Sequence, residues 1–517
     1  MTNVIKLIAP LFIIVCMFLA TWIYFKNPPQ EKSGYKKYFC DFKSIFMDKN
    51  VCYGVNDASV KLNSKIKVLP KDIFKGMNNL ETLELQSTGL MSIDESIFNN
   101  LSNLKKLNIH NSSLVYIPSQ LFNGLEKLES LSLTSTRIKS FEDKIFHGLR
   151  KLKVLQLNNN NLTSLRSNSF VELKSLQRLY LQSNKISLIH NETFDGLDKL
   201  EELDINNNNL SSVESGIFTG LNSLKYLRLS SNKLSTLDYN LFEDLKNLKE
   251  LDISNNNLTH LDKDIFMNVG NLEILNIAAN RLTHLDLHIF NGLINLYKLY
   301  LNNNELIYFQ DQFFKDLPSL QILNLSTNKL VQLGNEHYRM SKKIQRLDIS
   351  NNNITSLAKN IFNGVYDLIT LNISFNHIET IKPGTFENLT KLYKFDMSHN
   401  GFVDLPLNNF HGLDGLRFFY LQSNKIKSID HGYFDSMTEL MQLDVSNNSL
   451  TYLTDNVFKN NKKLMSIKLS YNNINEIHDD TFEGLDGLHD LYLDNNDENI
   501  FNSNAIKNLS PLVNKHF

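Results

Sequence analysis

The sequence predicts a solenoid, in which 18 copies of one 24-residue unit stack along a single rod. Two observations support this prediction. The frame L-x-x-L-x-L-x-x-N-x-L, with Ile at some leucine positions, returns every 24 residues from Leu80 to Leu488, and these 408 residues make 17 intervals without an insertion or deletion. In addition, Phe occupies one position of the unit in 17 of 18 copies, from Phe74 to Phe482. A length of 517 residues alone would have suggested several domains.

Each part of the unit has a physical role. In the unit that begins at Leu152, Leu155 and Leu157 alternate with polar residues, as in a short strand with one buried face. Asn160 follows where the chain must turn, and its amide can both donate to and accept from backbone groups inside the stack. Asparagine holds this position in 15 consecutive units. The first three units carry a hydroxyl instead and should have a weaker ladder: Thr88, Ser112 and Thr136.

The composition excludes several classes of protein. With 42% hydrophobic and 21% charged residues and a mean hydropathy of -0.25, the chain is neither wholly disordered nor a multi-span membrane protein. Lys+Arg 53 against Asp+Glu 55 leaves no basic excess, so we expect no nucleic-acid partner. Three cysteines are too few for a zinc ribbon or a disulfide-dense miniprotein.

The repeat resembles the 24-residue leucine-rich repeat of Toll-type receptor ectodomains and related extracellular proteins, over roughly residues 56 to 510. The plant G-x-I-P signature is missing, and the shorter bacterial form lacks the Phe positions. The resemblance implies an α/β horseshoe with a parallel sheet on its concave side. We therefore divide the chain into a signal peptide or signal-anchor (1–26), a linker with an N-terminal cap (27–79), the solenoid (80–510) and a C-terminal tail (511–517).

The N-terminal segment has two interpretations. Residues 7–25 are nearly continuous apolar sequence, long enough to span a bilayer once as an uncleaved anchor. A signal peptide cut after Ala20 is the alternative, although Phe18 stands where a small residue is expected. Four lysines between 26 and 37 argue against the anchor, which we nevertheless favour. Both interpretations place the repeats outside the cytosol, either secreted or on the extracellular face of the plasma membrane.

The two ends of the solenoid need covers. By resemblance, Cys40 and Cys52 form a disulfide in a reduced version of the usual four-cysteine cap, and two free thiols are the alternative. Val60 and Leu62 lie one residue out of the repeat frame and should form the cap strand. No cysteine follows Cys52, so the C-terminal cysteine cap of many relatives is missing. Three explanations are open for the apolar C-terminal end of the solenoid: the last residues cover it, a partner protein binds to it, or the gene product is truncated.

Twelve N-x-[ST] sequons occur, although the repeat frame itself generates such triplets. A glycan on Asn324 or Asn372, at the centre of two strands, would obstruct the concave face between about 320 and 375. We therefore expect a concave ligand to contact strands within 152–301 or 416–493. The sequon asparagines are Asn100, Asn111, Asn161, Asn191, Asn209, Asn257, Asn324, Asn353, Asn372, Asn388, Asn447 and Asn508.

The central outward residue of each strand supplies the candidate ligand contacts. Tyrosines there offer contact area and a hydrogen bond at low entropic cost. Aspartates recur every 48 residues, which indicates either duplication of a two-repeat unit, as the two LDISNNN copies at 251 and 347 suggest, or an acidic ligand surface. The candidates are Tyr180, Asp204, Arg228, Asp252, Tyr300, Tyr420, Asp444 and Tyr492.

One unit departs from the pattern. In residues 331–344, Tyr338 replaces the repeating Phe and Ser341 replaces an apolar residue. The resemblance to Toll-type receptors implies a ligand or dimer contact in such an irregular repeat, and a tolerated local defect is the alternative.

No catalytic motif, phosphate loop or metal-ligand spacing occurs, so we expect no enzyme activity, no metal and no cofactor. The sequence instead favours extracellular recognition of a protein or glycan ligand in immunity, adhesion or development, by a receptor without its own signalling domain. A homo- or heterodimer and a membrane contact through the N-terminal segment are compatible with it. The alternatives are a secreted carrier or regulatory subunit, and a matrix component.

Overall fold

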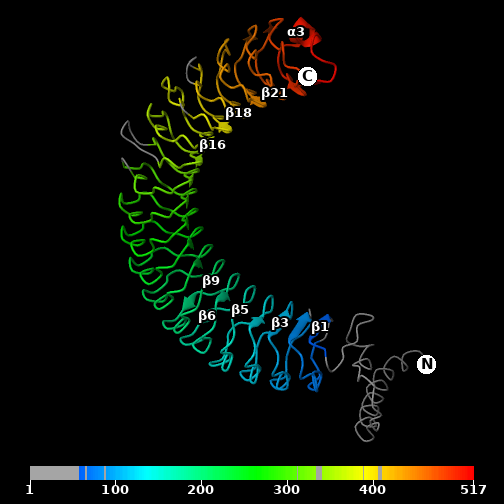
Figure 1. Cartoon of the computed structure of the whole chain (residues 1–517), viewed down its shortest axis with the longest axis vertical. Helices are drawn as coiled ribbons and strands as arrows, with labels where there is room; N and C mark the ends of the chain where they lie inside the picture. The colour runs from blue at the N-terminus through cyan, green and yellow to red at the C-terminus, as the bar shows by residue number, and fades with distance from the viewer. Residues whose placement is uncertain are drawn as a thin grey trace, which may run out of the picture.

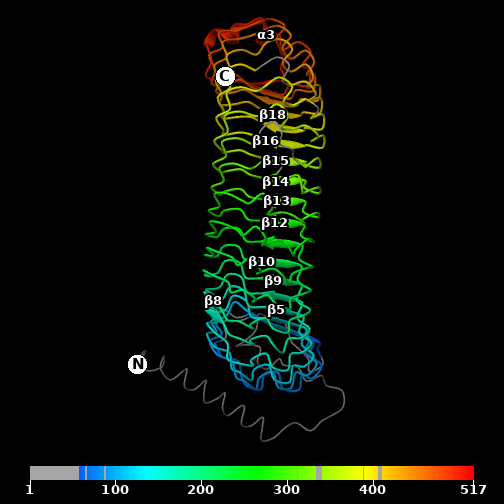
Figure 2. The same cartoon turned by 90° about the vertical axis from the view of Figure 1, so that its left-hand side faces the viewer.

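The computed structural model of the chain describes residues 57–63, 67–86, 89–310, 313–333, 341–387, 389–405 and 410–517. These residues form one arc of stacked coils with the strands along its inner side (Figure 1), and successive coils lie nearly parallel to one another (Figure 2). Several predictions fall outside the described residues and are not tested by the structure. They concern the apolar segment 1–26, Cys40, Cys52, Thr88, Tyr338 and Asn388.

A 20-stranded sheet lines the inner side of the arc. The first part of the sheet contains β1 Ser59–Asn63, β2 Thr82–Gln86, β3 Lys106–His110, β4 Ser130–Ser132, β5 Val154–Gln156, β7 Arg178–Tyr180, β9 Glu202–Asp204, β10 Tyr226–Arg228, β11 Glu250–Asp252 and β12 Ile274–Asn276. The second part contains β13 Lys298–Tyr300, β14 Ile322–Asn324, β15 Arg346–Asp348, β16 Thr370–Asn372, β17 Lys394–Asp396, β18 Phe418–Tyr420, β19 Gln442–Asp444, β21 Ser466–Lys468, β23 Asp490–Tyr492 and β24 Asn514–His516.

Every strand of this sheet pairs in parallel with the strand of the next repeat, and from β2 onward the register equals the 24-residue repeat length. Leu227, for example, pairs with Leu203 on one side and Leu251 on the other, and all three are fully buried. Two two-stranded parallel sheets are separate from the main sheet: β6 Ser164–Leu165 with β8 Leu188–Ile189, and β20 Tyr452–Leu453 with β22 Glu476–Ile477. The predicted solenoid of 18 repeats with a parallel inner sheet is therefore confirmed.

Phenylalanine rings fill the outer side of the core and help to set the curvature. Where neighbouring rings stack, their centroids are 5.8 to 6.4 Å apart and their planes are within 30°. Strands in a sheet are only ~4.8 Å apart. Because each repeat is wider at its outer side than at its inner side, the stack must bend toward the strands. Phe290 stacks on Phe266 within the column and also meets Phe313 edge-on at 5.6 Å.

The outer side of the arc contains turns rather than helices, so the helical part of the predicted α/β class is small. Isolated turns such as the one closed by Met267 N and Asp264 O (3.0 Å) carry the chain past the Phe column. Each is too short to nucleate a helix. Helix within the described residues is confined to the C-terminal end, where η2 Glu498–Asn502 and α3 Asn504–Lys507 are found.

The asparagine position forms a buried ladder. Asn256 Nδ2 donates to the carbonyls of Leu229, Ile253 and Ser254 at 3.1 Å each, and its Oδ1 accepts from Leu234 N at 3.0 Å. One side chain thus joins its own repeat to the preceding one. Of the three hydroxyl residues at the N-terminal end, the buried Ser112 has no hydrogen-bond partner, as the predicted weaker ladder requires, whereas Thr136 donates to Asn160 Oδ1 and Thr88 lies outside the described residues.

Both ends of the described solenoid extend the sheet. Val60 pairs with Leu83, 23 residues on, so the out-of-frame cap strand is confirmed as β1. Residues 511–517 were expected to be a tail, but β24 within them pairs with β23, with His516 beside Tyr492. The 24-residue spacing from Tyr492 to His516 places that segment on the next coil. Ile506 continues the spine and is buried.

Replacing Asn256 should destabilise the solenoid locally. Asn256→Ala leaves buried backbone groups of two repeats without partners, at a cost of about 2–4 kcal/mol. Urea unfolding followed by circular dichroism measures the loss, and hydrogen exchange locates it. Asn222→Ala, at an exposed asparagine, is the control and should stay within about 0.5 kcal/mol of wild type. Equal losses in both variants would contradict this role of the ladder.

Candidate ligand-binding surface

The inner face of the sheet carries two rows of outward side chains that matter for binding. The central row consists of the last residues of the three-residue strands, one per repeat, from Gln156 on β5 to Tyr492 on β23. The edge row consists of the residue directly after the first leucine or isoleucine of each repeat, from Glu81 to His489. Because the strands are in register, neighbours within a row are one strand apart.

Aspartates and asparagines of the central row stabilise the turn that follows each strand. Asp252 Oδ1 accepts hydrogen bonds from Ser254 N at 3.0 Å and from Ser254 Oγ at 2.6 Å. The same pair of bonds occurs at Asn324, Asp348, Asn372, Asp396 and Asp444. The recurring acidic residue therefore has a structural reason, which the sequence interpretation had not considered. The sequence feature that indicates this role is a serine two residues after the aspartate or asparagine.

In the N-terminal half of the surface, two predicted contact residues, Tyr180 and Arg228, are bound by glutamates of neighbouring strands. Tyr180 Oη donates to Glu202 Oε2 at 2.8 Å, and Arg228 Nη1 lies 2.6 Å from Glu202 Oε1. Arg228 Nη2 lies 3.2 Å from Glu250 Oε1. Burial raises the pKa of Tyr180, and the Glu202 hydrogen bond adds to this shift. Tyr180 and Arg228 are thus held by β9 and β11, so a ligand would have to compete with these bonds.

The remaining predicted tyrosines are available for contact to different degrees. Tyr300 and Tyr420 are half-buried at the ends of β13 and β18. Tyr492 stacks on His516 with centroids 4.0 Å apart and planes at 5°. Asp444 is buried, and its Oδ2 lies 3.6 Å from Lys468 Nζ. Of the predicted anchors, Tyr420 is the one that lies next to the cationic and aromatic side chains described below.

The edge row changes character along the arc. Its N-terminal part is paired into salt bridges between neighbouring repeats: Glu81–Lys105, Glu129–Lys153, Glu201–Lys225 and Lys249–Glu273, all between 2.7 and 3.1 Å. The next three residues are polar and uncharged: Tyr297, Gln321 and Gln345. The row then becomes mostly apolar: Ile369, Tyr393, Arg417, Met441 and Met465.

An aromatic and cationic cluster joins two residues of the apolar part of the edge row, Tyr393 and Arg417, to residues of β17 and β18. The Tyr393 and Phe418 rings are 5.3 Å apart, and the Arg417 guanidinium carbon lies 5.4 Å from the Tyr393 centroid. Lys394 Nζ lies 5.3 Å from the Tyr420 ring in the same strand pair. We call these five residues the aromatic cluster. The sequence interpretation, which considered only the central row, missed all of them except Tyr420.

The aromatic cluster is solvent-exposed yet rests on a rigid base. Tyr393 is 40% exposed, and in the same row Ile369, one repeat before it, and Met465, three repeats after it, are 38% and 39% exposed. Beneath the strands, Phe395 and Phe419 replace the usual inner leucines and stack at 5.5 Å. Exposed Tyr, Phe, Met and Arg on a rigid support are the residue types that protein interfaces favour.

Another exposed aromatic lies in the turn that follows β16. Phe375, which is 53% exposed, adopts a φ of 51° at the position where most repeats carry Asn or Ser. A bulky residue is strained in this left-handed region. Its ring stacks on His399 at 3.9 Å, and His399 also has a φ of 51°. The pair enlarges the exposed aromatic area over β16 and β17.

The sequon asparagines that the structure describes are exposed or half-buried. Asn324 and Asn372 lie on the inner face as predicted, with Oδ1 engaged by Ser326 and Ser374. Of the irregular repeat, Ser341 is buried and its hydroxyl donates to Leu320 O at 3.3 Å. Its neighbour Tyr338 lies outside the described residues, so a ligand contact there stays a prediction.

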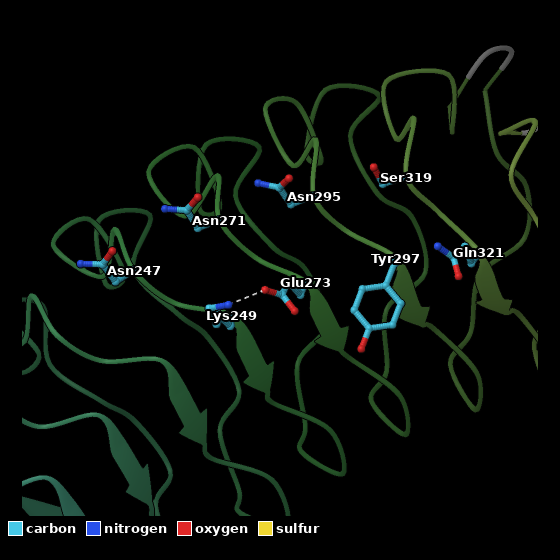
Figure 3. Close-up of a pocket in the computed structure, with 8 residues that line it drawn as sticks. All are labelled: Asn247, Lys249, Asn271, Glu273, Asn295, Tyr297, Ser319 and Gln321. Carbon is cyan, nitrogen blue, oxygen red and sulfur yellow. Dashed lines mark hydrogen bonds and ion pairs between the residues drawn. The ribbon is translucent and has the colours of Figure 1, made fainter.

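Among the described residues, no group of three or more His, Cys, Asp and Glu side chains is placed to hold a metal ion. Within the same residues, no helix is long and apolar enough to cross a membrane. A polar groove of about 610 Å³ runs beside the edge row near β11 to β14 (Figure 3).

Comparison with protein families gives a match over most of the chain. The profile described as leucine rich repeat matches eleven segments, from 78–138 to 438–497, which overlap except for a break between 338 and 342. The protein belongs to the leucine rich repeat family. A comparison with curated protein sequences finds no match.

Solved structures share the fold at low sequence identity. The Toll chain in the Drosophila Toll–Spatzle complex has a TM-score of 0.74 and 22% identity, covering 84% of this chain and 60% of that one. This protein therefore spans about three fifths of that Toll chain. A plant peptide hormone receptor, RGFR1, solved with RGF2, has a TM-score of 0.61 and 21% identity, with coverage of 84% and 75%. A Leptospira interrogans LRR protein has a TM-score of 0.56 and 25% identity, with coverage of 94% and 100%.

The buried carboxylate of Asp204 should make stability depend on pH. Burial raises the pKa of Asp204 in the folded state. At a pH above this pKa, the cost of burying the charged carboxylate lowers the free energy of unfolding. At a pH below the pKa of the same group in the unfolded chain, the carboxyl is neutral in both states and this cost is absent. Asp204→Asn keeps an oxygen for Asn206 N and should raise the unfolding midpoint at about pH 7, but not at about pH 3. Asp252→Asn, at a more exposed aspartate, is the matched control. A lower midpoint for Asp204→Asn at neutral pH would contradict the prediction.

Proposed function

We propose that this protein is an extracellular recognition protein that binds a protein ligand on the inner face of its C-terminal half. The observation that carries the proposal is the edge row. Repeats in the N-terminal half neutralise this row with salt bridges, whereas the repeats from 369 to 465 leave Ile, Tyr and Met side chains exposed beside the aromatic cluster. Exposed contiguous apolar residues on a soluble surface typically mark an interaction site.

The aromatic cluster has the composition of a binding hot spot. Tyrosine and arginine dominate such sites because they bury a large area and still satisfy polar atoms. Arg417 contributes a planar cation against Tyr393, and its Nη2 lies 3.8 Å from Glu439 Oε2. The site agrees only in part with the expected concave contacts: Arg417, Phe418 and Tyr420 lie within 416–493, whereas Ile369 lies in the stretch from 320 to 375 that a glycan on Asn372 would obstruct. Toll, solved with Spatzle, offers a precedent for a protein ligand on this fold.

The extracellular setting of the proposal rests on the sequence. The apolar segment at 7–25 directs the chain out of the cytosol, as a cleaved signal or as a single membrane anchor. Exposed sequons such as Asn100, Asn191 and Asn353 are accessible to glycans in that compartment. A Cys40–Cys52 disulfide would be stable there.

Substitution of the apolar edge row should abolish ligand binding. Tyr393→Glu combined with Met465→Lys places charges where the ligand buries apolar surface, so affinity should fall at least about 30-fold. The wild-type chain and the variant are compared by quantitative affinity capture from the native tissue, and the captured ligand is then titrated against both. Lys105→Glu, at the same register in an N-terminal repeat, is the control. A ligand bound equally by the wild type and the double variant would place the site elsewhere.

The extracellular assignment predicts covalent modifications. Protein from its native source should lose mass on enzymatic removal of N-glycans, with modified peptides containing Asn100, Asn191 and Asn353. Under non-reducing conditions, the peptides that contain Cys40 and Cys52 should be recovered as one disulfide-linked species. A chain recovered without glycans and with both thiols free would refute this localisation.

A further inference from the structure

The polar groove near the middle of the arc lies outside the aromatic cluster and is formed by two parallel rows of side chains (Figure 3). One row contains Asn247, Asn271, Asn295 and Ser319, each directly before the first leucine of a repeat. The other belongs to the edge row and contains Lys249, Glu273, Tyr297 and Gln321. The groove has a volume of about 610 Å³, within the range of roughly 300–1,000 Å³ that is usual for small-ligand sites.

The asparagines of the groove are held in fixed orientations. Nδ2 of Asn247, Asn271 and Asn295 donates to a backbone carbonyl of the preceding repeat, at 2.7, 2.8 and 3.2 Å. Within the described chain, the three amide oxygens accept no hydrogen bond from the protein. The result is a series of pre-oriented polar groups, one per repeat. Preorganisation of this kind lowers the entropic cost of binding.

The groove carries no unbalanced charge. Lys249 Nζ and Glu273 Oε1 are 2.7 Å apart and neutralise each other. Five successive residues of the first row, from Ser223 to Ser319, are uncharged. Elsewhere the same position frequently holds a charged residue, as at Lys127, Lys151, Lys199, Lys343, Asp367, Lys391, Glu439 and Lys463.

One aromatic ring completes the groove. Tyr297 is half-exposed, and Lys298 Nζ lies 5.1 Å from its ring centroid, a contact that restrains the ring beside β13. Gln321 follows it in the row and supplies a further amide. The groove thus combines a flat apolar surface with amide and hydroxyl groups on both sides.

We infer that this groove binds a linear, uncharged oligosaccharide. Sugar hydroxyls both donate and accept, which matches a lining of amides and hydroxyls. The apolar face of a pyranose ring packs well on an aromatic side chain such as Tyr297. An extended chain of pyranose rings advances by roughly 5 Å per ring, close to the ~4.8 Å between strands, so consecutive rings can meet consecutive repeats.

Other ligand classes fit the groove less well. An anionic polysaccharide or phosphate needs unpaired cations, whereas the lysine that lines the groove is already paired with Glu273. A small apolar ligand needs a mostly hydrophobic lining, and this lining is mostly polar. The inference is independent of the protein ligand proposed for the aromatic cluster, which lies further along the arc.

Titration calorimetry of the full chain with cellohexaose, laminarihexaose and the fully N-acetylated chitin hexasaccharide tests this inference. At least one of these uncharged hexasaccharides should bind saturably. Tyr297→Ala should weaken binding about tenfold, and Asn271→Ala about threefold to tenfold. Tyr297→Phe keeps the ring and should lose less than Tyr297→Ala. A heparin-derived hexasaccharide of similar length serves as the charged probe and should not bind the groove.

Asn103→Ala is the matched control. Asn103 Nδ2 donates to Asn78 O at 2.8 Å from the equivalent position of an N-terminal repeat, so the variant loses the same backbone contact outside the groove. Its affinity for the hexasaccharide should equal that of wild type, and circular dichroism melts of all variants should agree. Binding to none of the uncharged hexasaccharides, binding to the heparin fragment alone, or an equal loss in Asn103→Ala would overturn the inference.

Discussion

The structure depends on one recurring interaction, the hydrogen bonding of a buried asparagine to the backbone of its own and the preceding repeat. Asn256 reaches Leu229 O and Leu234 N, so its geometry is satisfied only if the two repeats are in register. A buried amide without these partners would be costly. This explains why the frame runs from Leu80 to Leu488 without an insertion or deletion: a single extra residue would leave an amide and several backbone groups unpaired.

The same constraint determines where the protein can vary. Inner leucines, asparagines and Phe rings are fixed by contacts with equivalent residues on neighbouring coils, and the wider spacing of the rings bends the arc toward the strands. Only outward side chains are free to differ between repeats. Along the edge row, the side chains first form salt bridges, then line the polar groove, and then become mostly apolar and exposed. Two distinct binding surfaces can therefore lie on one nearly uniform scaffold.

The aspartates of the central row show that repetition alone does not identify function. Their recurrence suggested either gene duplication or an acidic ligand surface, yet Asp252 and Asp444 each accept hydrogen bonds from the serine two residues on. Tyr180 and Arg228 were also predicted to contact ligand, and the structure shows them bound to Glu202. Residues chosen for their position on the exposed face turned out to stabilise that face.

The amino-acid sequence by itself determined the solenoid, its 18 repeats, the Phe column, the asparagine ladder and the out-of-frame cap strand at Val60. These follow from periodicity, because a residue that recurs at one position of a stacked unit must meet its own equivalents. Only the tertiary structure decided which exposed residues form surfaces. Tyr393, Phe418 and Tyr297 lie at ordinary positions of the repeat, and the contacts of Tyr393 with Arg417 and Phe418 join residues 24 and 25 apart in the chain. Their significance depends on side-chain orientation and curvature, which the repeat pattern does not encode.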